Sequence, residues 1–94
     1  MGVEYRIEFA PAATDTIDEI LRSVKYFAQT IEFDQQVNYE YRLPDNPGSM
    51  PNAQASIETY GIYFCDFGGA RDIMADIVQQ INDRIGAPDV AQLE

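Results

Sequence analysis

The chain has 94 residues, of which sixteen are acidic, six are basic and none is histidine. A chain of this length builds one hydrophobic core, and its hydrophobic fraction of 46% is typical of a globular protein rather than a disordered one. The net charge of −10 argues against binding to nucleic acid or to an anionic membrane, and it favours a basic protein or a metal cation as the partner.

The same composition bears on the compartment. The single cysteine, Cys65, cannot form a disulfide within the chain, which is unlike a protein built for an oxidising environment. The first residues, MGVEYRIEF, alternate between apolar and polar types, so we expect no signal peptide. We therefore expect a cytoplasmic protein.

The first half of the chain predicts a strand, a helix and a second strand. Apolar and charged residues alternate over residues 3–9, which indicates a strand with one wet face. A helix is expected to begin at residues 14–16 and to run to Ile31, because apolar residues recur on one helical face throughout that stretch. Alternation returns over residues 37–42 and predicts the second strand.

The second half predicts a loop, a strand, a helix and a tail. Three prolines, a glycine and two asparagines make residues 43–55 a long loop. A central strand is expected over residues 56–65, with a bulge at Gly61. An apolar stripe predicts a helix from residue 69 or 70 to Ile85, after which residues 87–94 form a tail. We interpret the terminal Leu93-Glu94 as a candidate cloning remnant.

These elements predict one α+β domain, a two-layer β-α-β-β-α sandwich with its core in residues 3–86. A right-handed crossover would give a three-stranded sheet in the order 2-3-1, with both helices on one face. The element order resembles a ferredoxin-like fold that lacks its last strand. In that arrangement the first strand lies at an edge of the sheet, where it could pair with a second copy, so a monomer and a homodimer both stay open.

The stretch YFCDFGG, residues 63–69, raises the question of a reactive or phosphate-binding centre. A reactive Cys65 would need a nearby base or cation, yet the chain has no histidine and Asp66 is adjacent. The DFG triplet of kinases stands here without the other kinase motifs. We therefore expect a buried structural cysteine, followed by a glycine turn into the last helix.

The same topology places Asp66 at one end of the sheet together with Glu32 and Asp34. Carboxylate oxygens are the ligands that hard divalent cations prefer. We interpret these three residues as a candidate metal site, and we expect no other cofactor.

The candidate partner-binding residues lie in the long loop and on the helices. Loops of this length are often functional, and this one carries Asp45, Asn46 and Met50. Tyr26 is expected to be exposed on the first helix. Three aspartates are expected on one face of the last helix: Asp72, Asp76 and Asp83.

Without histidine or a nucleophile–base pair, the chain is not expected to be an enzyme. We expect a small acidic binding module that regulates or inhibits a protein partner. The alternative is a regulatory domain that binds a small ligand or a divalent cation.

Overall fold

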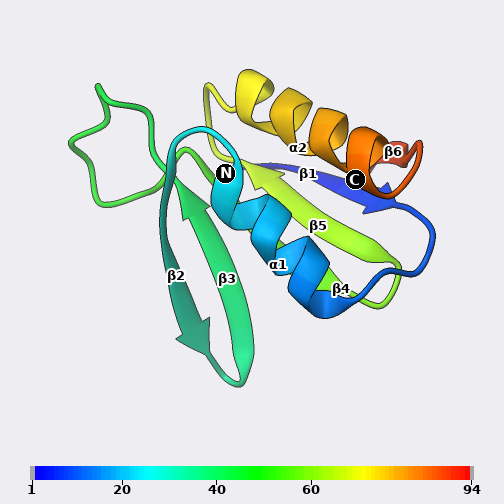
Figure 1. Cartoon of the computed structure of the whole chain (residues 1–94). Coiled ribbons are helices and arrows are strands. Elements are labelled where there is room, and N and C mark those ends of the chain that lie inside the picture. Colours follow the sequence, from blue (N-terminus) through cyan, green and yellow to red (C-terminus); the bar gives the residue numbers. More distant parts are fainter. Residues whose placement is uncertain (1, 94) are drawn as a thin grey trace.

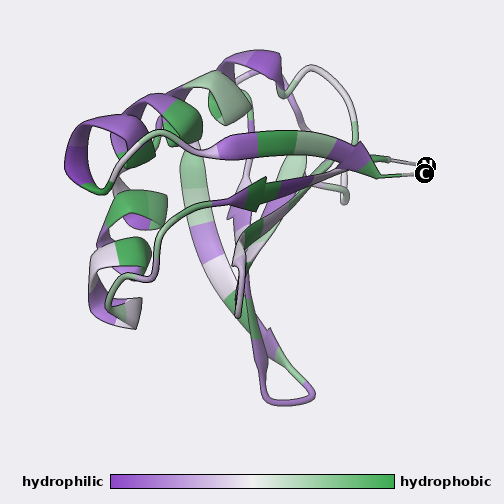
Figure 2. Cartoon of the chain, turned by 90° about the vertical axis from the view of Figure 1, so that its right-hand side faces the viewer, coloured by the Kyte–Doolittle hydropathy of each residue, from purple (hydrophilic) through white to green (hydrophobic). Residues whose placement is uncertain are grey.

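The computed structural model describes residues 2–93 and shows two helices on one side of a six-stranded antiparallel sheet (Figures 1 and 2). The strand order across the sheet is β2-β3-β4-β5-β1-β6. In chain order the elements are β1 (Val3–Glu8), α1 (Thr14–Ser23), β2 (Phe27–Phe33), β3 (Gln36–Tyr41), β4 (Ala53–Glu58), β5 (Gly61–Asp66), α2 (Arg71–Arg84) and β6 (Asp89–Leu93).

The hydrophobic core lies between the sheet and the helices. On α2 the predicted stripe is confirmed, because Ile73, Ile77 and Ile81 recur every four residues and are fully buried. The strands contribute every second residue to the same layer, including Ile7, Ile62, Phe64, Tyr39, Tyr41, Ala53 and Ala55. The other face of the sheet has no helix over it, as expected for an antiparallel sheet with one wet side (Figure 2).

The expected three-stranded sheet in the order 2-3-1 is wrong, and the first reason lies in the predicted helix. Helix α1 ends at Ser23, and residues 27–33 form β2 instead of continuing the helix. Val24 is already extended, and Tyr26 takes a left-handed backbone conformation with φ 66°. The segment FAQTIEF then pairs with β3 through a turn at Asp34 and Gln35, both of which have positive φ.

The second reason is that the predicted central strand is a hairpin. Strands β4 and β5 are joined by Thr59 and Tyr60 and pair from Ala53–Asp66 to Glu58–Gly61. The expected bulge at Gly61 is therefore wrong, since Gly61 is the first residue of β5 and the pairing with both neighbouring strands begins there without a shift. Glycine is needed there because φ is 146° and a Cβ atom would stand 2.2 Å from the carbonyl oxygen of Ile7.

The third reason is the tail. Residues 89–93 form β6, which pairs with β1 from Glu4–Leu93 to Glu8–Asp89. Leu93 therefore belongs to the sheet, while Glu94 lies outside the described residues. Strand β1 has β5 on one side and β6 on the other, so the expectation that it could pair with a second copy at a free edge is wrong as well.

Neither helix within residues 2–93 is long and apolar enough to cross a membrane.

Candidate functional site

The helix-free face of the sheet, which we call the open face, carries the side chains that alternate with the core. On β1 these are Glu4, Arg6 and Glu8, whose side chains point to the face opposite the one on which Ile7 is buried. The pairing registers place the charged side chains of the neighbouring strands on the same face, namely Glu40, Glu58 and Asp89. The strand residues of the open face thus include five acids and one base.

The single base of this face is already engaged. The Arg6 guanidinium lies 3.4 Å from the Glu8 carboxylate and stacks 4.0 Å from the ring centre of Tyr60. Glu8 stands directly opposite Asp89 in the β1–β6 pairing, and like charges in that position destabilise a sheet. The open face therefore keeps a surplus of negative charge that its own residues do not neutralise.

Glu40 is the most enclosed acid of the open face. Only 5% of its surface is exposed. One carboxylate oxygen accepts a hydrogen bond from the Gln29 amide, and the other accepts one from the Gln54 amide, each at 3.1 Å. Among residues 2–93, no lysine or arginine forms an ion pair with it. A desolvated carboxylate held only by neutral donors is an arrangement that a cation would stabilise.

The open face also contains Tyr63 and Cys65 of β5. The Tyr63 hydroxyl donates a 2.6 Å hydrogen bond to Glu4, and burial together with this contact raises the tyrosine pKa. Cys65 is buried as expected, and that burial raises the pKa of its thiol. The adjacent Asp66 accepts hydrogen bonds from the backbone N–H groups of Gly68 and Ala70, which fixes the turn into α2. The YFCDFGG stretch is thus a strand end and a turn.

The three predicted metal ligands do not lie together. Asp66 pairs with Ala53 and Val3 at one end of the sheet, whereas Asp34 occupies the β2–β3 turn at the other end. Glu32 lies beside that same turn, opposite Val37. Within residues 2–93, no three acidic or cysteine side chains form a group that could hold a metal ion. The prediction that these residues cluster is wrong because it rested on a three-stranded sheet, whereas the chain forms a six-stranded one.

The long loop predicted for partner binding is tied down at both of its ends. Arg42 donates to the carbonyl oxygens of Gly48 and Ser49 at 2.7 and 2.8 Å. Asn52 donates to the Gly68 carbonyl at 2.8 Å, which joins the loop to the turn of the YFCDFGG stretch. A cavity of about 530 Å³ lies between the two segments, and its lining includes Asp45, Asn46 and Met50.

The other predicted contact residues are placed elsewhere. Tyr26 is exposed, but it lies in the α1–β2 connection rather than on a helix. Asp76 is half-buried and accepts a 2.9 Å hydrogen bond from the backbone N–H of Lys25, so it holds α2 to that connection. Asp83 accepts from Gln79, and Asp72 lies in the first turn of α2.

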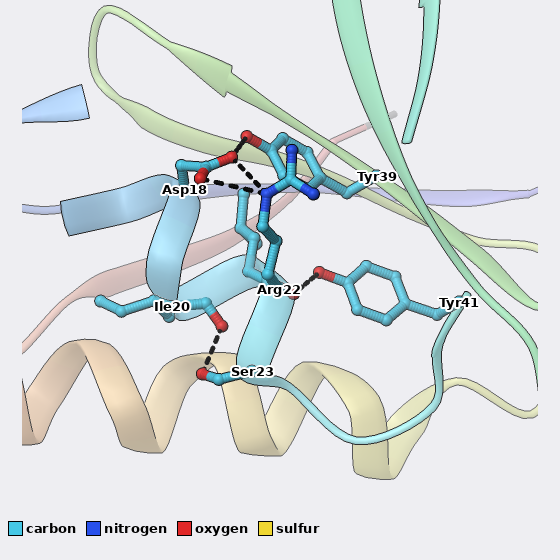
Figure 3. A network of polar contacts seen from close by, with 7 residues as sticks. Asp18, Ile20, Arg22, Ser23, Tyr39 and Tyr41 are labelled. Atoms are coloured by element: carbon cyan, nitrogen blue, oxygen red, sulfur yellow. Dashed lines mark hydrogen bonds and ion pairs between the residues drawn. The ribbon is translucent and has the colours of Figure 1, made fainter. Parts of the chain in front are cut away.

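A polar network on the helix side supports the position of β3 (Figure 3). Asp18 of α1 accepts hydrogen bonds from the Tyr39 hydroxyl and, at 2.9 Å, from Arg22. The Tyr39 contact is the main cause that holds the pKa of Asp18 below its usual range. The buried Tyr41 hydroxyl donates to the Leu21 carbonyl at 2.7 Å. Helix α1 is thereby fixed against the strand that presents Glu40 on its opposite face.

The open-face acids were not predicted as a site, because the alternation of apolar and charged residues indicates only that one face of each strand is exposed to solvent. Glu40 stood in a strand pattern like any solvated acid, and the placement of Gln29 and Gln54 on the two neighbouring strands encloses it. No protein-family model, curated protein or solved structure matches this chain.

Proposed function

We propose that this protein is a non-catalytic binding module that holds a basic segment of a partner protein on the open face of its sheet. The observation that carries the proposal is Glu40, an enclosed carboxylate without a cationic partner in an uncovered, acidic surface. A lysine or arginine from a partner would supply the missing positive charge. Such charge-assisted hydrogen bonds are roughly twice as strong as neutral ones.

The surroundings of Glu40 favour a protein rather than a free ion. Glu4, Glu58 and Asp89 extend the negative surface over three further strands, which suits several cationic side chains at once. Ile31 and Phe33 continue the same face on β2 and are exposed, and Phe33 retains 76% of its surface. Exposed aromatic residues are enriched where proteins bind one another.

The proposed role follows from the chemistry of such a partner. A protein that acts through a basic surface would lose that activity while the surface is held, so the module would inhibit or regulate it. The single cysteine fits a reducing compartment such as the cytoplasm.

The test uses two variants that remove the same charge from different surfaces. The first replaces open-face acids (Glu4→Gln, Glu58→Gln, Asp89→Asn), and the second replaces the loop and helix acids of the sequence hypothesis (Asp45→Asn, Asp72→Asn, Asp83→Asn). Calorimetric titration with a lysine-rich peptide should show a loss of affinity of about tenfold or more for the first variant only. An equal loss in both variants would mean that net charge alone attracts the peptide, and the proposal would be wrong.

A further inference from the structure

Strands β3 and β4 separate before either of them ends. Their pairing covers only three residue pairs, from Tyr41–Ala53 to Tyr39–Ala55. Strand β3 continues outward through residues 36–38, and β4 continues through residues 56–58, yet no pairing joins these two segments. The β2–β3 hairpin turns away from the rest of the sheet at this point (Figures 1 and 2).

A cavity occupies the place where the two strands separate. Its volume is about 460 Å³, and its floor includes Val37, Tyr39 and Ile57. Thr14 at the start of α1 and Thr59 in the β4–β5 turn also line it. The inner edges of both strands reach this space with backbone groups that no other strand within residues 2–93 pairs from that side.

Among the residues that line the cavity, Glu58 is the charged one. The residues next to the lining residues in sequence or pairing add four acids to the neighbouring surface: Asp15, Asp34, Glu40 and Glu32. Two arginines approach from neighbouring elements. Arg22 lies 5.8 Å from the ring centre of Tyr39 but pairs with Asp18, and Arg6 stacks on Tyr60 but pairs with Glu8.

We propose that the cleft between β3 and β4 receives an extended segment of the basic partner. This segment would hydrogen-bond as an added β-strand to the unpaired edges at residues 36–38 and 56–58. This inference rests on the proposed function and adds the way in which the partner is recognised. Unpaired strand edges bind extended peptides through main-chain hydrogen bonds, and alternate side chains then give specificity. Alternation suits this cleft, because apolar side chains would face Val37 and Ile57 while cationic ones would face Glu58 and Glu40.

The experiment uses a capped seven-residue peptide that alternates lysine with valine. A second peptide replaces each valine with proline, so it keeps the charge but cannot donate strand hydrogen bonds at those positions. On titration of the full chain, we expect the amide NMR signals of residues 36–38 and 56–58 to shift with the first peptide. The proline peptide should bind at least about fivefold more weakly.

Two matched variants locate the binding. Val37→Arg places a positive charge in the cleft, and Val3→Arg places one at the other end of the sheet; the two valines have similar exposures of 37% and 41%. We expect Val37→Arg to lower the affinity for the lysine–valine peptide by about tenfold. Val3→Arg should lower it by less than about twofold.

Equal affinity for both peptides, an equal effect of both variants, or absence of shifts at residues 36–38 and 56–58 would overturn the inference. Those results would leave the comparison of open-face and control acids intact, so the inference and the proposed function fail separately.

Discussion

Glu40 is the residue at which stability and binding should conflict. Its carboxylate is enclosed and held by two glutamine amides, without an ion pair among the described residues. Burial of an unpaired charge is costly, whereas a neutral amide of the same shape can be accommodated if one neighbouring glutamine turns its amide over.

We therefore expect Glu40→Gln to raise the free energy of unfolding by about 1 kcal/mol while it weakens binding of the lysine-rich peptide. Urea unfolding and calorimetric titration of the same preparation measure the two effects. Asp45→Asn, which removes an exposed loop acid, is the control and should change neither quantity appreciably. If Glu40→Gln is less stable and binds as well as the parent chain, Glu40 is a structural residue only.

The pair of Asp18 and Tyr39 makes a prediction about pH. Because the pKa of Asp18 lies below its usual range in the folded chain, its contribution to stability is present above the ordinary value of about 3.9. That contribution is lost as the pH falls through the lower pKa of the folded state. Tyr39→Phe removes the contact that is the main cause of this shift.

Tyr39→Phe should therefore cost about 1 kcal/mol of unfolding free energy at pH 7, because water screens the partly exposed Asp18 carboxylate, and the difference from the parent chain should shrink near pH 3. Tyr41→Phe is the matched control, because its hydroxyl donates to the uncharged Leu21 carbonyl. Its cost should be similar at both pH values. A constant cost for Tyr39→Phe across the same range would contradict the assigned role of Asp18.

At the scale of elements, the β2–β3 hairpin carries backbone strain at its turn. Asp34 and Gln35 have φ values of 53° and 65°, and a residue with a side chain such as glutamine pays for this conformation. Gln35→Gly should stabilise the chain by roughly 1 kcal/mol, which is about 4–8 °C in melting temperature for a domain of this size. Gln36→Gly, in the strand beside it, should lower the melting temperature instead. A lower melting temperature for Gln35→Gly would show that the turn is held by its side chain.

This hairpin also shows what sequence patterns could and could not predict. The apolar positions Ile17, Ile20, Leu21 and Val24 are buried as the helical pattern indicates, and α2 follows its stripe. The pattern was wrong beyond Ser23 because Phe27 and Ile31 extend the helical spacing by coincidence, while FAQTIEF is also rich in residues that favour strands. Pairing with β3 decides between the two readings, and a single sequence does not display that pairing.

The other two missed elements have different causes. The β4–β5 turn at Thr59 and Tyr60 lacks the usual glycine or asparagine at its centre, so one long strand was expected. Strand β6 is short and largely exposed, and only its pairing with β1 makes it a strand. Among the open-face acids, only Asp89 comes from a strand that the expected fold did not contain, but Gln29, which holds Glu40, lies on β2 where a helix was expected.

The whole molecule is asymmetric in its two faces. Two helices cover one face of the sheet (Figure 2), and the other face carries the acids of the strands. Glu58 belongs both to that face and to the lining of the cleft beside β3. The long-range attraction of a basic partner to this surface should weaken as salt screens it. Under the proposed function, direct contacts with Glu40 would add a contribution that depends less on salt.

The side-chain amide signals of the glutamines test most directly whether a basic partner binds to the open face. Gln29 and Gln54 hold Glu40 on the open face, whereas Gln79 and Gln80 lie on α2 and serve as controls in the same NMR spectrum. On titration with the lysine-rich peptide, we expect the Gln29 and Gln54 amide signals to shift and those of Gln79 and Gln80 to stay unchanged. Shifts confined to Gln79 and Gln80 would place the partner on the helices and contradict the assignment of the open face.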